Sequence, residues 1–276
     1  MTRIGKLFEQ LRREKRCGMI AYLTAGDPNP EATPDLVAAL ERGGADLIEL
    51  GVPFSDPIAD GPVIQQAGDR AIRAGTTVAK VLAMAAEIRE RSEIPLLLFT
   101  YLNPALRYGF ARLAADAKAA GIDGCLLTDV SVEEAGDYVK VMREAGIDTV
   151  FLAAPTSTDH RLKLVAEYSS GFVYLVSRTG ITGEQQSLSD TALPLIERMR
   201  ALTNLPLAMG FGISTAAQVA AISAHADAVV VGSAIVRQIG KDPAGVEALM
   251  HDLTRPLIRL PRSAQMVGET GKAAIS

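Results

Sequence analysis

The sequence contains no tryptophan, two cysteines and three histidines among its 276 residues. The cysteines, Cys17 and Cys125, are far apart, and neither belongs to a Cys-x-x-Cys pair or lies beside a histidine at metal-binding spacing. The histidines, His160, His225 and His251, are equally scattered. This distribution argues against a cysteine- or histidine-based metal site, so we expect no metal. A reducing cytoplasm is the default location.

The chain also lacks long apolar runs and a surplus of charge of one sign. No run reaches 18 apolar residues, which argues against a membrane span. The net charge is −4 with both signs interspersed, and no basic stripe indicates nucleic acid. Residues 4–13 have helical spacing and carry charge throughout, which is untypical of a signal peptide. Small anionic ligands remain compatible, since local groups bind them.

Short apolar runs recur behind helix-ending motifs. GAD at 44–46, GID at 121–123 and 146–148, and HAD at 225–227 each precede such a run, and two further runs begin at a proline. This pattern predicts eight strands, at residues 19–23, 47–50, 95–99, 124–127, 149–152, 172–176, 206–209 and 228–231.

Amphipathic stretches separate the strands and are expected to be helices: 34–42, 64–73, 78–91, 132–145, 161–168, 191–202 and 215–224. Short apolar strands alternating with helices favour a (β/α)₈ TIM barrel, with 4–13 as an extra N-terminal helix. A doubly wound open sheet is the alternative, but no Gly-x-Gly-x-x-Gly follows the first strand. Without a linker or composition break, 1–276 is predicted to be one domain, with a flexible tail from about residue 260.

The segments after the second and sixth strands are longer than the others. In a barrel they lie at the C-terminal face, where active sites are built. The polar, glycine-containing segment 177–190 has the character of a mobile lid. Two long loops on one face predict a covered site.

Glu49 lies near the end of the second strand, before an acidic loop. If Leu47 and Glu49 point into the barrel, the carboxylate is partly desolvated and its pKa is raised toward values useful for proton transfer. The alternative is that Glu49 pairs with a cation. Asp56 and Asp60 are harder to separate, because aspartate before proline or glycine is common in turns.

Glycine-rich turns follow the seventh and eighth strands, GFGIS at 210–214 and GSA at 232–234, and each opens a helix. Backbone N–H groups at such positions bind anions, and many barrels hold a phosphate there. Helix capping alone would explain either turn singly. These residues therefore predict a barrel enzyme that uses carboxylate acid–base chemistry on a phosphorylated substrate.

The segment ELGVPFSDPIADGP at 49–62 resembles the signature of the tryptophan synthase alpha-chain family. Further similar segments are TAGDP at 24–28, YLNP at 101–104, APTS at 154–157, VSRTGITG at 176–183 and both glycine-rich turns. The resemblance implies cleavage of indole-3-glycerol phosphate to indole and glyceraldehyde 3-phosphate. It also implies a complex of two alpha and two beta chains, pyridoxal phosphate on the beta chain, and no cofactor in this chain.

By the same resemblance, Glu49 is the acid–base residue and Asp60 stabilises positive charge on the indole N–H. Asp56, which lies mid-loop between Ser55 and Pro57, is interpreted from its position as facing the partner surface. The implied substrate-binding residues are Tyr22, Phe99, Tyr101, Tyr174, Thr182, Gly183, Phe211, Gly212, Gly232 and Ser233.

The chain departs from the family pattern at a few positions. Ser131 stands where the family usually has proline, and Tyr22 where phenylalanine is common. These changes concern one loop and the polarity of the pocket. Two alternatives remain: a barrel enzyme acting on a different phosphorylated sugar or indole precursor, and a non-catalytic subunit that activates a partner.

Overall fold

A parallel sheet that nearly closes into a barrel forms the centre of the computed structural model, which describes residues 1–176, 188–210 and 212–257. The strand order is β5-β4-β3-β2-β1-β9-β8-β7-β6. The strands are β1 (Gly18–Thr24), β2 (Leu47–Gly51), β3 (Leu96–Thr100), β4 (Gly124–Leu127), β5 (Asp148–Val150), β6 (Leu152–Ala153), β7 (Val173–Val176), β8 (Leu207–Gly210) and β9 (Ala228–Val231).

Eight strands were predicted, and each predicted run carries a strand. The ninth arises because the predicted run 149–152 forms two short segments, β5 and β6, on either side of Phe151. β5 pairs with β4 and β6 pairs with β7, so this run changes its pairing partner at Phe151. The two ends of the strand order are therefore adjacent in the chain, and the barrel is confirmed over the open sheet.

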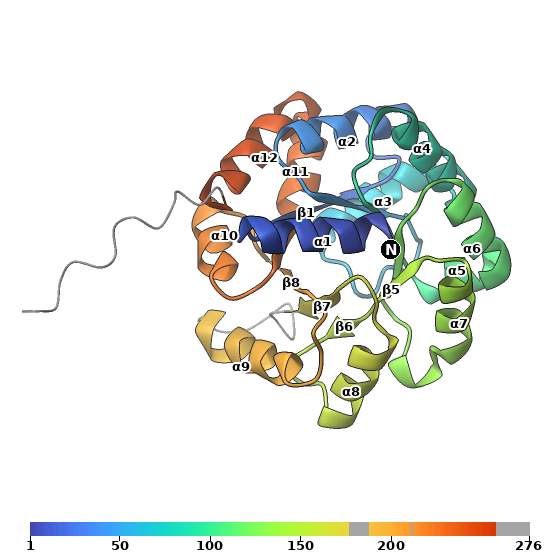
Figure 1. The fold of residues 1–276 in the computed structure, drawn as a ribbon. Coiled ribbons are helices and arrows are strands. Elements are labelled where there is room, and N and C mark those ends of the chain that lie inside the picture. Colours follow the sequence, from blue (N-terminus) through green and yellow to red (C-terminus); the bar gives the residue numbers. More distant parts are fainter. Residues whose placement is uncertain (177–187, 211, 258–276) are drawn as a thin grey trace, which may run out of the picture.

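Helices alternate with the strands and surround the sheet (Figure 1). They are α1 (Arg3–Glu14), α2 (Thr33–Arg42), α3 (Pro62–Arg73), α4 (Val78–Arg91), α5 (Leu102–Tyr108), α6 (Phe110–Ala119), α7 (Gly136–Glu144), α8 (Asp159–Tyr168), α9 (Leu188–Arg200), α10 (Ala216–Ser223), α11 (Ser233–Lys241) and α12 (Val246–Thr254). Short 3-10 turns are η1 (Pro30–Ala32), η2 (Val132–Glu134), η3 (Pro243–Gly245) and η4 (Arg255–Leu257). The predicted stretch 132–145 is divided between η2 and α7.

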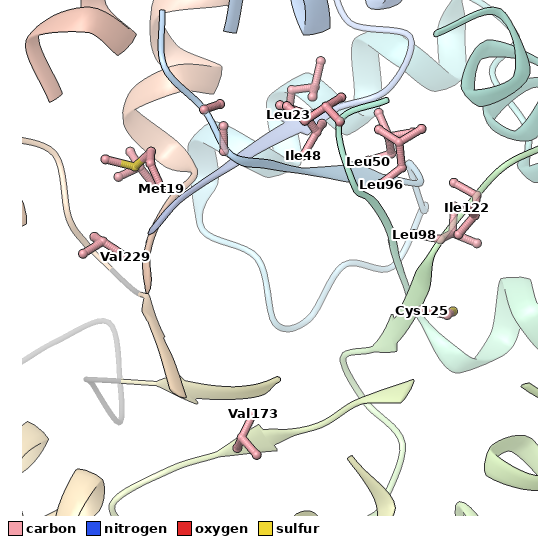
Figure 2. Packing of buried hydrophobic residues seen from close by; sticks show 14 of the residues in the cluster. Met19, Leu23, Ile48, Leu50, Leu96, Leu98, Ile122, Cys125, Val173 and Val229 are labelled. Atoms are coloured by element: carbon pink, nitrogen blue, oxygen red, sulfur yellow. The ribbon is translucent and has the colours of Figure 1, made fainter. Parts of the chain in front are cut away.

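The two faces of each strand pack against different partners, as the alternation of side chains requires. Ile48 and Leu50 belong to the cluster between sheet and helices, which Figure 2 shows from close by. Leu47 instead belongs to a second cluster inside the barrel, together with Leu97. Glu49 has the same parity as Leu47, so its side chain also points into the barrel.

Helix α1 covers one end of the barrel. Its apolar residues Ile4, Phe8 and Leu11 are in the same cluster as the interior side chains, and the rings of Phe8 and Phe172 are 5.7 Å apart. Figure 1 shows α1 lying across the barrel opening. The C-terminal ends of the strands, where the active site is expected, lie at the opposite end of the barrel, because β1 begins directly after α1.

Two predicted features lie outside the described residues. They are most of the lid, 177–187, and the tail, 258–276. In the part of the chain that the structure describes, no helix has the length and apolar character needed to cross a membrane.

Candidate active site

Glu49 lies inside the barrel with no exposed surface. It is paired in register with Tyr22 on β1 and with Leu97 on β3. Neither carboxylate oxygen has a hydrogen-bond partner among the described residues, so these residues give no support to a pairing with a cation. Burial alone raises the pKa of Glu49 to about 8. The group is therefore largely protonated at neutral pH and is able to act first as an acid and then as a base.

Two buried tyrosines face Glu49, and glycines make room for them. Tyr22 and Tyr174 both interact electrostatically with Glu49, and burial raises the pKa of each phenol. A β-carbon at Gly51 would collide with the Tyr22 hydroxyl, and one at Gly210 with the Tyr174 hydroxyl. The missing side chains at the ends of β2 and β8 thus make room for the two phenol hydroxyls.

Asp60 lies on the loop between β2 and α3, and Tyr101 supports it. The Tyr101 hydroxyl accepts a hydrogen bond from the Ala59 N–H at 3.1 Å, and the Asp60 N–H donates to the Pro57 carbonyl at 3.0 Å. Burial raises the pKa of Asp60 to about 6, an effect that a hydrogen bond from Tyr101 partly offsets. Asp60 is therefore mostly ionised at neutral pH, whereas Glu49 is mostly protonated.

Asp56 has a different environment from Asp60. Its side chain is exposed and accepts a 2.6 Å hydrogen bond from the neighbouring Ser55 hydroxyl. Ile58, two residues further on, is 84% exposed. The structure thus gives the two aspartates different environments, since Asp56 is exposed whereas Asp60 is partly buried and interacts with Tyr101.

The two glycine-rich turns differ in how their helix N-termini are satisfied. At α10 a capping box uses the Thr215 and Gln218 side chains, which bond to the helix N-terminus themselves. At α11 the cap residue is Gly232, no side chain caps the helix, and Ser233 is its first residue. Because no side chain caps α11, its N-terminus is the better candidate of the two for binding an anion. Gly212 contributes a turn with φ of 75°, which favours glycine.

Some predicted site residues are brought together and others lie outside the described residues. Tyr22 and Phe99 pack edge to face with ring centroids 5.2 Å apart, and Tyr101 packs on Phe54 at the same distance. Thr182, Gly183 and Phe211 lie outside the described residues.

Sequence reasoning missed the cluster that α3 and α11 form with Tyr22. It contains Ala67 and Val236, with Val63 and Ile64 partly buried beside them. In the sequence, the only indication of this cluster was the apolar face of each helix, and such a face does not show which residues it will pack against. No group of three or more potential metal ligands lies together in the described part of the chain.

Residues 8–259 match the sequence model of the family "Tryptophan synthase alpha chain". The chain belongs to this family. It is 66% identical to the tryptophan synthase alpha chain of Solibacter usitatus over 261 residues, which cover 94% of this chain and 98% of that relative. The corresponding protein of Geotalea uraniireducens is 47% identical and covers 86% of this chain and 89% of its own length.

Solved tryptophan synthase structures have the same fold. Tryptophan synthase subunit alpha from Legionella pneumophila superposes with a TM-score of 0.84 at 35% identity, covering 93% of this chain and 98% of its own. A chain of Mycobacterium tuberculosis tryptophan synthase in an open form gives 0.85 at 36% identity, with the same coverage. Members of the tryptophan synthase alpha-chain family are lyases acting on indole-3-glycerol phosphate, and the chain is an enzyme of this class.

Proposed function

We propose that Glu49 and Asp60 carry out the cleavage of indole-3-glycerol phosphate. The observation that supports this most is the pair of carboxyl groups with separated pKa values, about 8 for Glu49 and about 6 for Asp60. When a site gives two titratable groups different pKa values in this way, the group with the higher pKa can act as the acid and the other as a fixed negative charge. Both assignments match the roles implied by the family signature.

The reaction proceeds in two proton transfers. Protonated Glu49 gives its proton to C3 of the indole ring, and the Asp60 carboxylate stabilises the positive charge that appears at the ring N–H. Glu49, now a carboxylate, removes the proton from the hydroxyl on the carbon attached to C3. The carbon–carbon bond breaks, its electron pair restores the aromatic ring, and an aldehyde forms. Indole and glyceraldehyde 3-phosphate are the products, and Glu49 is protonated again.

The remaining pocket residues hold the substrate. The phosphate binds the N-terminus of α11 at Gly232 and Ser233, with Gly212 beside it. Tyr22, Phe99, Tyr101 and Tyr174 line the pocket, and we extend the proposal to Thr182, Gly183 and Phe211 on the strength of the family pattern alone.

A tryptophan synthase beta chain is the proposed partner, in a complex of two alpha and two beta chains that carries pyridoxal phosphate on beta. The catalytic face has apolar side chains that suit such a contact: Ile58 is 84% exposed and Leu106 is 53% exposed. Asp56 lies beside Ile58 and would supply charge at the same surface. We place the complex in the cytoplasm and treat 1–276 as one domain.

Indole release by the purified chain, with and without a beta chain, tests the proposal. Because the chain has no tryptophan, indole fluorescence can be followed without a protein background of the same kind. We expect Glu49→Gln to abolish release while 3-(indol-3-yl)propyl phosphate, which cannot be cleaved, still binds. Full activity in this variant would remove Glu49 from the mechanism. Absence of release from the wild type under both conditions would favour a non-catalytic subunit.

A further inference from the structure

The ring of Tyr22 is held from several sides. It packs against Phe99 of β3, Ala67 of α3 and Val236 of α11, and only 6% of the residue is exposed. A β-carbon at Gly232 would lie 3.4 Å from the Tyr22 β-carbon, so the base of the side chain adjoins the α11 turn. The ring therefore has little freedom, and the position of its hydroxyl is set by packing.

The Tyr22 hydroxyl has weak hydrogen bonding in this arrangement. It lies over Gly51, which presents no side chain, and 3.5 Å from the Thr24 hydroxyl. That separation is at the outer limit for a hydrogen bond. Buried phenols usually find a partner, because an unpaired buried hydroxyl costs free energy. The O–H group is thus available to a stronger acceptor.

The acceptors that face this hydroxyl can be enumerated by element. Among the described residues, β1 offers Thr24, β2 offers Glu49, the loop before α3 offers Asp60, the residue after β3 is Tyr101, and β7 offers Tyr174. The residues of α3 and α11 in the Tyr22 cluster are apolar. Of the two carboxyl groups, Asp60 interacts with the Tyr22 hydroxyl more strongly than Glu49 does. Asp60 also has a hydrogen bond with Tyr101, so one carboxylate interacts with both phenols, through a hydrogen bond with Tyr101 and through charge alone with Tyr22.

We propose that Tyr22 is a positioning residue for Asp60: with the indole ring bound, its hydroxyl donates to one oxygen of the Asp60 carboxylate. Tyr101 supports the same loop, and the second carboxylate oxygen is left for the indole N–H. A hydrogen bond to the ionised form favours that form, so Tyr22 keeps Asp60 anionic when the indole ring is bound. The inference rests on the proposed role of Asp60 and assigns a task to the hydroxyl, beyond the packing of the ring.

The test compares kcat, whose pH dependence reports the substrate-bound enzyme, over a range of pH for wild type and Tyr22→Phe. We expect the acid limb, which reports Asp60, to move up by about 0.5 to 1 pH unit, so that kcat falls about 3- to 10-fold at pH values below the limb and less than about 2-fold at pH 7. KM should change little, since the ring remains. Tyr108→Phe is the matched control, because it removes a 2.6 Å phenol–carboxylate bond to Asp116 away from the site and should leave the profile unchanged.

A double-mutant cycle separates positioning from packing. In an Asp60→Asn background, Tyr22→Phe should have little further effect on indole release, because the acceptor charge is gone. An equal loss in both backgrounds, or an unshifted acid limb, would overturn the inference while leaving the lyase function intact. If Tyr22→Phe fails to fold, 3-fluorotyrosine at position 22 replaces it, and its more acidic phenol should move the limb down. Absence of indole release by wild type would instead overturn the proposed function.

Discussion

Replacing Glu49 by glutamine should stabilise the fold at alkaline pH. The carboxyl has a pKa of about 8 in the folded chain against 4.5 for an ordinary glutamate. Folded protein therefore binds a proton that unfolded protein releases, and the free energy of unfolding falls as the pH rises from 4.5 to about 8. At about 1.4 kcal/mol per pKa unit, the whole decrease is about 5 kcal/mol at most. Glutamine cannot ionise, so the variant does not undergo this decrease in unfolding free energy.

Urea unfolding at intervals between pH 5 and pH 9 measures this effect. The difference in unfolding free energy between Glu49→Gln and wild type should be near zero at the acid end, and should grow in favour of the variant until about pH 8. Glu90→Gln, an exposed carboxylate on α4, is the control for general charge effects. If the difference in unfolding free energy between the variant and wild type did not vary with pH, Glu49 would not be a buried, protonated carboxyl group.

Three further outcomes follow from the same geometry. The pH profile of kcat/KM should be bell-shaped. Its acid limb should lie near pH 6, because Asp60 must be ionised, and its basic limb near pH 8, because Glu49 must be protonated. Rates of indole release measured across this pH range check both limbs. Gly51→Ala should lower kcat and cost about 1 to 3 kcal/mol of stability, because its β-carbon collides with the Tyr22 hydroxyl; urea unfolding and indole release measure the two losses. Phe8→Ala should cost about 3 to 5 kcal/mol by opening a cavity against Phe172, which thermal or urea unfolding will show.

The fold could be predicted from the sequence because each of its units carries its own signal. Strands such as β2 are short apolar runs behind a glycine-containing cap, and the alternation along 47–50 correctly directed Glu49 inward. The split of the fifth strand at Phe151 could not be predicted in this way. It depends on which neighbour each half of the strand pairs with, and that is a property of the closed sheet.

The sequence predicted the presence of a buried acid in the candidate site, but not how the loop and the helix N-termini around it are arranged. Glu49 stood out because an ionisable residue ended a buried strand. Residue context alone did not distinguish Asp56 from Asp60, since both occupy turn-forming positions, and it was the family resemblance that assigned Asp60 to the indole N–H. The structure adds that Asp56 is exposed, whereas Asp60 is partly buried beside Tyr101. The contrast between α10 and α11 as anion sites depends on the Thr215–Gln218 capping box, whose closure is a matter of three-dimensional geometry.

Helix α1 closes one end of the barrel, and by excluding water there it affects the pKa of Glu49, which serves the opposite end. Glu49 has no hydrogen-bond partner in the described chain, and burial alone raises its pKa. Water entering the barrel at the α1 end would therefore lower the pKa of Glu49. Ile4, Phe8 and Leu11 prevent that entry at the end remote from the substrate. The helix thus sets the proton affinity of an acid it does not touch, and substitutions along its apolar face should be visible in the basic limb of the rate profile as well as in stability.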